Sequence, residues 1–179
     1  YLTPVAGALT QEAIDVAVIL NALRALVPAR TLGHEVMQPS AAKALHEDHE
    51  ALTGALDRLR EIADALDDSE PQLSVSLINE AKSLVASRIV AHEQEDEAHV
   101  YPAMAKYLRD GHGLAAMSRA HREILHLSRL LVRLSDGLTA EDANRYLVRD
   151  AQRIIESIEA LVRIHNAQEE DIYEHAASA

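Results

Sequence analysis

Histidines and carboxylates are the side chains of this sequence that are most suited to chemistry. The chain of 179 residues contains ten histidines and 29 aspartates and glutamates, but no cysteine. The lack of cysteine excludes disulfides, zinc or iron–sulfur sites built from thiolates, and cysteine nucleophiles. If these imidazole and carboxylate groups bind a metal, they favour a hard or borderline metal ion.

Two short motifs place a carboxylate one helical turn after a histidine. They are His92-x-x-x-Asp96 and His165-x-x-x-Glu169, and residues four apart share one face of a helix. Acidic helices produce this spacing by chance, and a single histidine on an apolar face is usually a hydrogen-bonded core residue. The motifs therefore gain meaning only from the helices that position them.

Almost the whole chain has the periodicity of helices, and strand signals are missing. Gly and Pro number only 6 and 5, and they stand between the periodic segments. The pattern predicts helices over about 10–27, 40–66, 71–100 or beyond, 114–135, and from about 140 to 175. Four long amphipathic helices with short loops favour an all-α, up-down-up-down four-helix bundle with an additional N-terminal helix. We therefore divide the chain into an N-terminal helix and linker, residues 1–39, and the bundle, residues 40–179.

A count of roughly 100° per residue shows which polar side chains face the predicted core. Each of the four long helices places one histidine among its apolar residues: His49, His92, His121 and His165. Asp96 and Glu169 fall on the same faces. The neighbouring acidic residues are predicted to point away from the core: Glu93, Glu95, Glu97 and Glu170.

The six core-facing polar groups would meet inside such a bundle. If they were left unsatisfied, they would cost about 1–3 kcal/mol each, and their sum would rival the roughly 5–15 kcal/mol by which a domain is stable. A hydrogen-bonded network could satisfy them, and a metal centre could satisfy all of them at once. Four imidazoles and two carboxylates exceed the needs of one tetrahedral zinc ion, whereas bridging carboxylates would let them hold two ions. We therefore infer a di-iron centre, with iron favoured over manganese or zinc.

The segments around these residues resemble a known family. The run from His92 through Asp96 and Glu97 to Tyr101 and Pro102 looks like the second-helix signature of hemerythrin-like, HHE cation-binding domains. Three further segments are similar to the family's first, third and fourth helices: LHEDHEAL at 45–52, AHREI at 120–124 and HNAQEEDIY at 165–173. The resemblance covers residues 40–176.

The resemblance implies an oxo- or hydroxo-bridged centre of two iron ions inside the bundle. It assigns the terminal ligands to His49, His92, His121 and His165, and the bridging ligands to Asp96 and Glu169. Two departures from the family pattern bear on this centre: Asp96 stands where a glutamate is usual, and Leu125 stands where oxygen carriers have a second histidine. A coordination position on the metal is thereby left for water, a small ligand, His46 or a tyrosine.

Three functions are compatible with these residues. The first is a non-haem di-iron protein that binds or reacts with O2, peroxide (H2O2) or NO; if it is an enzyme, the metals carry the reaction. The second is an iron- or oxygen-sensing module without turnover, in which the N-terminal helix contacts a partner or forms a homodimer. The third is a ferritin-like di-iron oxidase, which is disfavoured because His126 of its Glu123–His126 pair faces away from the core.

The charge balance argues against negatively charged partners. The chain has 17 Lys and Arg residues and a formal net charge of −12, which opposes binding to nucleic acid or to anionic membranes. The lack of Phe and Trp also argues against stacking on nucleic-acid bases. The most apolar stretch, residues 13–27, is too short to span a bilayer. No targeting segment stands out, and we expect a cytoplasmic protein.

Overall fold

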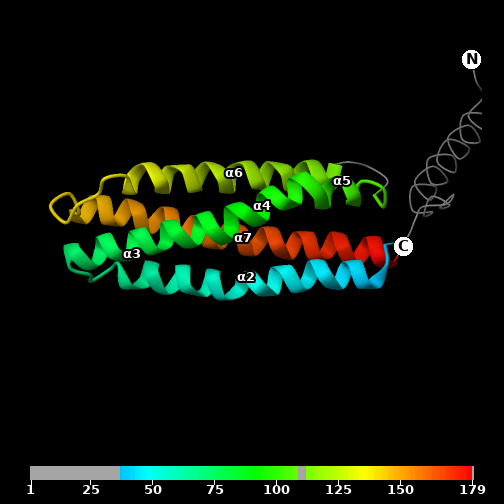
Figure 1. Cartoon of the computed structure of the whole chain (residues 1–179), viewed down its shortest axis with the longest axis horizontal. Coiled ribbons are helices and arrows are strands. Elements are labelled where there is room, and N and C mark those ends of the chain that lie inside the picture. Colours follow the sequence, from blue (N-terminus) through cyan, green and yellow to red (C-terminus); the bar gives the residue numbers. More distant parts are fainter. Residues whose placement is uncertain (1–36, 109–111, 179) are drawn as a thin grey trace, which may run out of the picture. The chain divides into compact units, whose positions relative to one another are not determined.

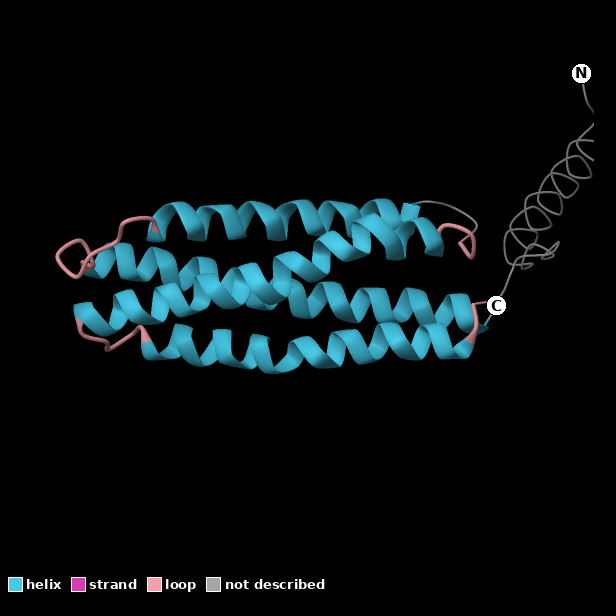
Figure 2. Cartoon of the chain, in the orientation of Figure 1, coloured by secondary structure: helices cyan, strands magenta, loops and turns pink. Residues whose placement is uncertain are grey.

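Four helical rods lie side by side in the described part of the chain (Figure 1). The structure is a computed structural model, and it describes residues 37–108 and 112–178. These residues form helices joined by short loops, with no strand among them (Figure 2). Three rods are single helices: α2 (Pro39–Ala65), α6 (His112–Ser135) and α7 (Arg145–Ser178). The second rod is a succession of segments: α3 (Pro71–Leu84), η1 (Val85–Ile89), α4 (Val90–Glu95), η2 (Asp96–Val100) and α5 (Tyr101–Met104).

The predicted all-α class is confirmed for the described residues. The arrangement is compatible with the predicted up-down-up-down bundle, since successive rods run in opposite directions in Figure 1. The predicted N-terminal helix lies outside the described residues, so that helix and the division of the chain at residue 39 stay predictions. Among residues 37–108 and 112–178, no helix combines the length and the apolar character that crossing a membrane requires.

Apolar side chains recur every three or four residues along each rod and face the neighbouring rods. In α2, Leu56 and Leu59 are buried, as the periodicity predicts for a helix with one apolar face. Val85, Ile124 and Ile158 come from the other three rods and join the same apolar cluster. Burial of these faces against one another is the main force that holds the rods together.

The buried apolar residues form two clusters along the bundle. The large cluster includes the second half of α2, the first part of the second rod, the second half of α6 and the first half of α7. The small cluster lies where α2 begins and α7 ends, and its buried members are Met37, Tyr101, Met104, Leu114, Met117, Tyr173 and Ala176. Between the two clusters, each rod carries polar residues instead.

The second rod contains two π-helical turns, η1 and η2, on either side of the short segment α4. A π-helical turn forms hydrogen bonds between residues five apart rather than four, so it takes up one extra residue. The face that follows is therefore rotated relative to a continuous α-helix. Such turns are frequent at functional sites, and these two flank His92.

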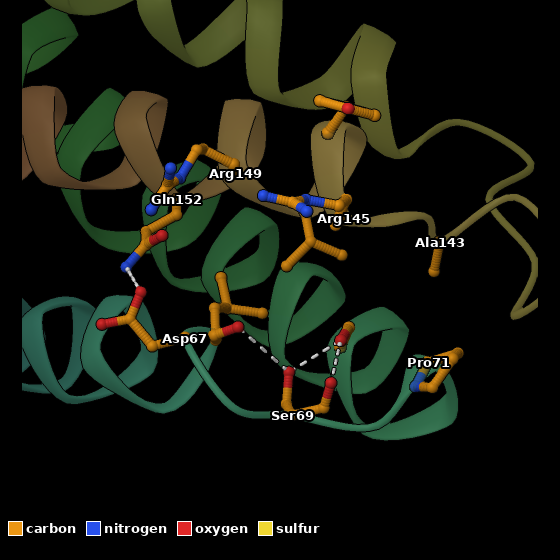
Figure 3. A pocket seen from close by; sticks show the side chains of 11 residues that line it. Asp67, Ser69, Pro71, Ala143, Arg145, Arg149 and Gln152 are labelled. Atoms are coloured by element: carbon orange, nitrogen blue, oxygen red, sulfur yellow. Dashed lines mark hydrogen bonds between the residues drawn. The ribbon is translucent and has the colours of Figure 1, made fainter.

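Polar contacts fasten the rods at the end of the bundle where α2 ends and α7 begins (Figure 3). Gln152 of α7 donates to the carbonyl of Ala63 at 3.0 Å and to the carboxylate of Asp67 at 2.9 Å. These contacts border a polar cavity that Arg149 also lines. At 1.5 Å per helical residue, the cavity lies about 20 Å along α7 from His165.

Candidate metal centre

A layer of polar side chains separates the two apolar clusters, and every rod contributes to it. Six of its members are at most 5% exposed, and the side chain of the seventh, His92, is 12% exposed. The members are His49 from α2, His92 and Glu93 from α4, Asp96 from η2, His121 from α6, and His165 and Glu169 from α7. The layer therefore contains all six residues that the sequence predicts as ligands.

The first donor group consists of His49, His92, Asp96 and Glu169. One nitrogen or oxygen atom from each of the four lies within 4.8 Å of the others. His49 Nε2 is 3.1 Å from Glu169 Oε2, and His92 Nε2 is 3.4 Å from Asp96 Oδ2. Atoms this close around one point can bind a common cation.

The second donor group consists of Glu93, His121 and His165, again with one atom from each within 4.8 Å of the others. His121 Nε2 is 2.8 Å from Glu93 Oε2 and 2.7 Å from His165 Nε2. Glu169 reaches this group as well, because its Oε1 is 3.3 Å from His165 Nε2. The Glu169 carboxylate thus has one oxygen beside each group.

Glu93 is the residue that sequence reasoning misses. The count along an unbroken α-helix predicts that Glu93 points to solvent, and this prediction is wrong, since Glu93 is 0% exposed. The π-helical turn η1, which lies directly before α4, rotates the rod so that Glu93 faces the core. Its neighbour Glu95 is exposed, as predicted.

The charges and unpaired atoms of the layer fit a bound cation. The carboxylates of Glu93, Asp96 and Glu169 are buried, and within the described residues no Lys or Arg forms an ion pair with them. Glu93 Oε1, Asp96 Oδ2 and His92 Nε2 are buried without a hydrogen-bond partner. Since an uncompensated buried charge costs several kcal/mol, metal ions would stabilise this layer, and its nitrogen and oxygen ligands suit iron, manganese or zinc.

Comparison with known protein families agrees with this arrangement. The model of the hemerythrin HHE cation-binding domain matches residues 40–177. The chain belongs to this family. No curated protein and no solved structure gives a significant match to the chain. The resemblance drawn from the four helix segments is thereby confirmed, and the His, Asp and Glu cluster fits a metal-binding hemerythrin-like protein.

Tyr101 contacts both donor groups of this hemerythrin-like centre. Its hydroxyl donates to Glu169 Oε1 and lies 3.0 Å from His121 Nε2. Its ring stacks on that of His121, with centroids 4.9 Å apart. Tyr173 packs beside His49 at a centroid distance of 5.9 Å, but its buried hydroxyl has no hydrogen-bond partner. Of the two tyrosines, Tyr101 is thus the one whose hydroxyl forms a hydrogen bond with a residue of the donor groups.

Two carboxylates of the outer surface contact the outward nitrogens of donor histidines. Glu97 Oε1 is 3.1 Å from His121 Nδ1, and Glu170 Oε1 is 3.4 Å from His49 Nδ1. In metal sites, a carboxylate on the second ring nitrogen fixes the tautomer and the orientation of the ligand histidine. Glu97 and Glu170 can therefore position the rings whose Nε2 atoms face the centre.

The other histidines considered from the sequence lie outside the donor groups. His46 is exposed and pairs with Glu170 at 3.1 Å, and His99 is exposed and pairs with Glu95 at 3.0 Å. In the structure His46 therefore lies outside both donor groups. Leu125 itself lines a mostly apolar cavity between α6 and the second rod.

Burial and the neighbouring charges shift the acid–base behaviour of the layer. Burial, helped by the negative charge of Glu169, raises the pKa of Asp96 to about 7. Burial alone would raise the pKa of Glu169, but hydrogen bonds with His165 and His49 lower it well below its ordinary value. Burial opposes protonation of His49, yet its contact with Glu169 raises the pKa of His49 overall. Without a metal ion, protons thus take part in compensating the carboxylates.

Proposed function

We propose that this hemerythrin-like chain is a non-haem di-iron protein that binds or reacts with a small ligand such as O2, peroxide or NO. The observation that carries the proposal is the position of Glu169, whose two oxygens lie beside different donor groups. A carboxylate so placed suits a bridge between two ions in the core of a helix bundle. Two separate single-metal sites would not need a shared residue.

The residues divide between the two proposed ions according to the donor groups. His49, His92 and Asp96 would hold one ion, and Glu93, His121 and His165 would hold the other, with Glu169 shared between them. Iron bound there would supply redox chemistry and an open coordination position for a small ligand. Asp96 belongs to the first group alone, so we assign it as a terminal ligand rather than a second bridge.

The chain's own residues would control what reaches the centre. The small cluster, with Met104, Leu114 and Met117, borders the polar layer on one side and would limit the access of water to it. Tyr101 would keep Glu169 in place through its hydroxyl. Burial and the charge of Glu169 raise the pKa of Tyr101, so its hydroxyl stays protonated at neutral pH and remains able to donate.

A sensing module without turnover is the second candidate, and three buried carboxylates without a Lys or Arg partner in the described residues favour it. Metal binding would remove their repulsion and stabilise the bundle, so that folding and metal occupancy would be linked. A partner could then read the metal-loaded state. The ferritin-like alternative finds less support, because His126 and His99 are both exposed.

Anaerobic titration with Fe²⁺, followed by exposure to a small ligand, tests the proposal. We expect about two iron ions per chain and a Mössbauer spectrum of two coupled irons. Subsequent addition of O2, peroxide or NO should change the absorption spectrum. Loss of these changes in His92→Ala, with the fold retained, would assign them to the centre. A chain that binds no iron would refute the proposal, and iron binding without any ligand response would leave the sensing module.

A further inference from the structure

A cleft between α2 and α7 connects the surface with the first donor group. The two helices lie side by side (Figure 1), and the cleft between them has a volume of about 390 Å³. His49, a member of the first donor group, forms part of its wall. Three polar residues that are open to solvent line it as well: His46, Glu50 and Glu170. The cleft therefore borders both solvent and a buried donor.

His46 and Glu170 form a pair inside this cleft. His46 Nδ1 is 3.1 Å from Glu170 Oε1, and the two side chains are 62% and 37% exposed. The same oxygen is 3.4 Å from Nδ1 of His49, whose Nε2 faces Glu169. The pair thus touches solvent on one side and a donor histidine on the other. Imidazole and carboxylate together are suitable ligands for a divalent transition-metal ion.

One buried side chain in the wall of the cleft carries a polar atom without a hydrogen-bond partner. It is Asn166, whose Oδ1 is unpartnered. Asn166 is 7% exposed and lines the cleft. A buried polar atom without a partner is costly, and amide oxygens are ordinary ligands of hard cations. Asn166 is therefore a residue of the cleft wall whose amide oxygen the protein leaves without a partner.

The charges that line the cleft favour a cation over an anion. Glu50 and Glu170 are carboxylates. Arg163 lines the cleft too, but its guanidinium is paired with Asp57 at 2.7 Å and with Glu159. The large and small apolar clusters border the polar layer along the bundle, and apolar packing is a poor route for a hydrated ion. The cleft is thus a polar approach to the centre.

Building on the proposed di-iron function, we propose that ferrous iron reaches the centre through this cleft and that His46 and Glu170 form a transient divalent-cation site on the way. The pair collects the ion from solvent, and Glu170 contacts the ring of His49, beyond which Glu169 and the first donor group lie. His46 takes no part in the loaded centre. Its contribution is to the rate at which metal arrives.

Loading kinetics with Co²⁺ as the probe test this route, because Co²⁺ develops visible absorption when protein nitrogen and oxygen atoms bind it. Metal-free protein is mixed with Co²⁺ in a stopped-flow instrument. We expect His46→Ala to load about tenfold more slowly, with the same final stoichiometry and spectrum. His99→Ala is the matched control, since it removes an exposed histidine paired with Glu95 at 3.0 Å outside the cleft; its rate should equal that of the unchanged protein.

Three results would overturn the route. His46→Ala could load as fast as the unchanged protein, or His99→Ala could be slowed equally. His46→Ala could also bind less Co²⁺ at the end, which would place His46 in the centre itself. Failure of the proposed function is distinguishable, because the unchanged protein would then bind neither Co²⁺ nor iron in the polar layer.

Discussion

Glu169 Oε2 lies 3.1 Å from Nε2 of His49, while Oε1 of the same carboxylate lies 3.3 Å from Nε2 of His165. His49 belongs to the first donor group and His165 to the second. One side chain therefore joins two groups whose members together come from all four rods. Because Glu169 is 0% exposed and Tyr101 donates to it, its position is fixed from several sides.

Glu169→Gln tests the shared carboxylate. The amide keeps the size of the side chain but removes the charge and one of the two acceptor oxygens, so it can no longer serve both groups at once. We expect iron binding to fall from about two ions per chain to at most about one, measured by metal analysis after anaerobic loading. Glu174→Gln, on the exposed face of the same helix, should leave the stoichiometry unchanged. Full loading of Glu169→Gln would show that no bridge is needed.

Glu93→Gln tests the residue that the π-helical turn brings into the core. We expect the second ion to be lost, leaving about one iron per chain, and the stabilisation by iron to shrink by about 2–4 kcal/mol. The metal-free variant should not be destabilised, because it no longer buries the charge of Glu93. Metal analysis and thermal unfolding with and without iron measure both effects.

Glu95→Gln is the matched control for Glu93→Gln, since both residues lie on α4 but the side chain of Glu95 is 65% exposed. Its iron stoichiometry and its stabilisation by iron should equal those of the unchanged protein. Equal effects of the two substitutions would contradict the assignment of Glu93 to the second group.

Tyr101→Phe should weaken the centre without emptying it. The ring can still stack on His121, but Glu169 loses the hydroxyl that donates to it. Loss of such an outer contact typically lowers metal affinity by about 10-fold or more. Tyr146→Phe is the control, because Tyr146 is 72% exposed near the start of α7, and iron affinity should hardly change. The two iron dissociation constants, compared by competition with a chelator, decide whether Tyr101 has this role.

Iron affinity should fall as the pH is lowered below about 7. The pKa of Asp96 in the metal-free fold is raised to about 7, so below that pH a proton must leave before the carboxylate can bind metal. For each proton released, affinity falls about tenfold per pH unit. The free energy of unfolding of the metal-free protein depends on pH in the opposite direction. Because the pKa of Asp96 is raised on folding, this residue stabilises the metal-free fold at low pH, and the contribution is lost as the pH rises through about 7.

Calorimetric titrations in buffers of different ionisation enthalpy measure the protons released on metal binding. Asp96→Asn should release fewer protons and show a shallower dependence on pH. An equal slope in the variant would mean that Asp96 stays ionised in the metal-free protein.

Much of the fold and of the centre follows from periodicity. The apolar stripes of four helices, with one histidine in each, are visible because an α-helix advances by a constant angle. His49, His121 and His165 lie on rods without π-helical turns, where this count holds. The outer contacts of Glu97 and Glu170 could not be predicted in this way. They depend on the distance between neighbouring rods, and the angular count describes only one helix at a time.

Glu93 could not be placed by a constant angle because η1 changes that angle. One signal is nevertheless present in the sequence: Ala81, Val85, Ile89 and Glu93 are spaced by four residues each. In a continuous α-helix these three steps would drift by about 120° around the axis, and Glu93, the last of the four, would leave the core face. All four are buried, because the π-helical turn corrects the drift. A long run of four-residue spacing can therefore indicate such a turn.

Anomalous diffraction from crystals of the iron-loaded protein, recorded at the iron absorption edge, tests the shared centre most directly. We predict about two iron peaks per chain in the polar layer, on either side of the Glu169 carboxylate. One should be bound by His49, His92 and Asp96, and the other by Glu93, His121 and His165. A single peak, or two peaks without Glu169 between them, would contradict the proposed centre.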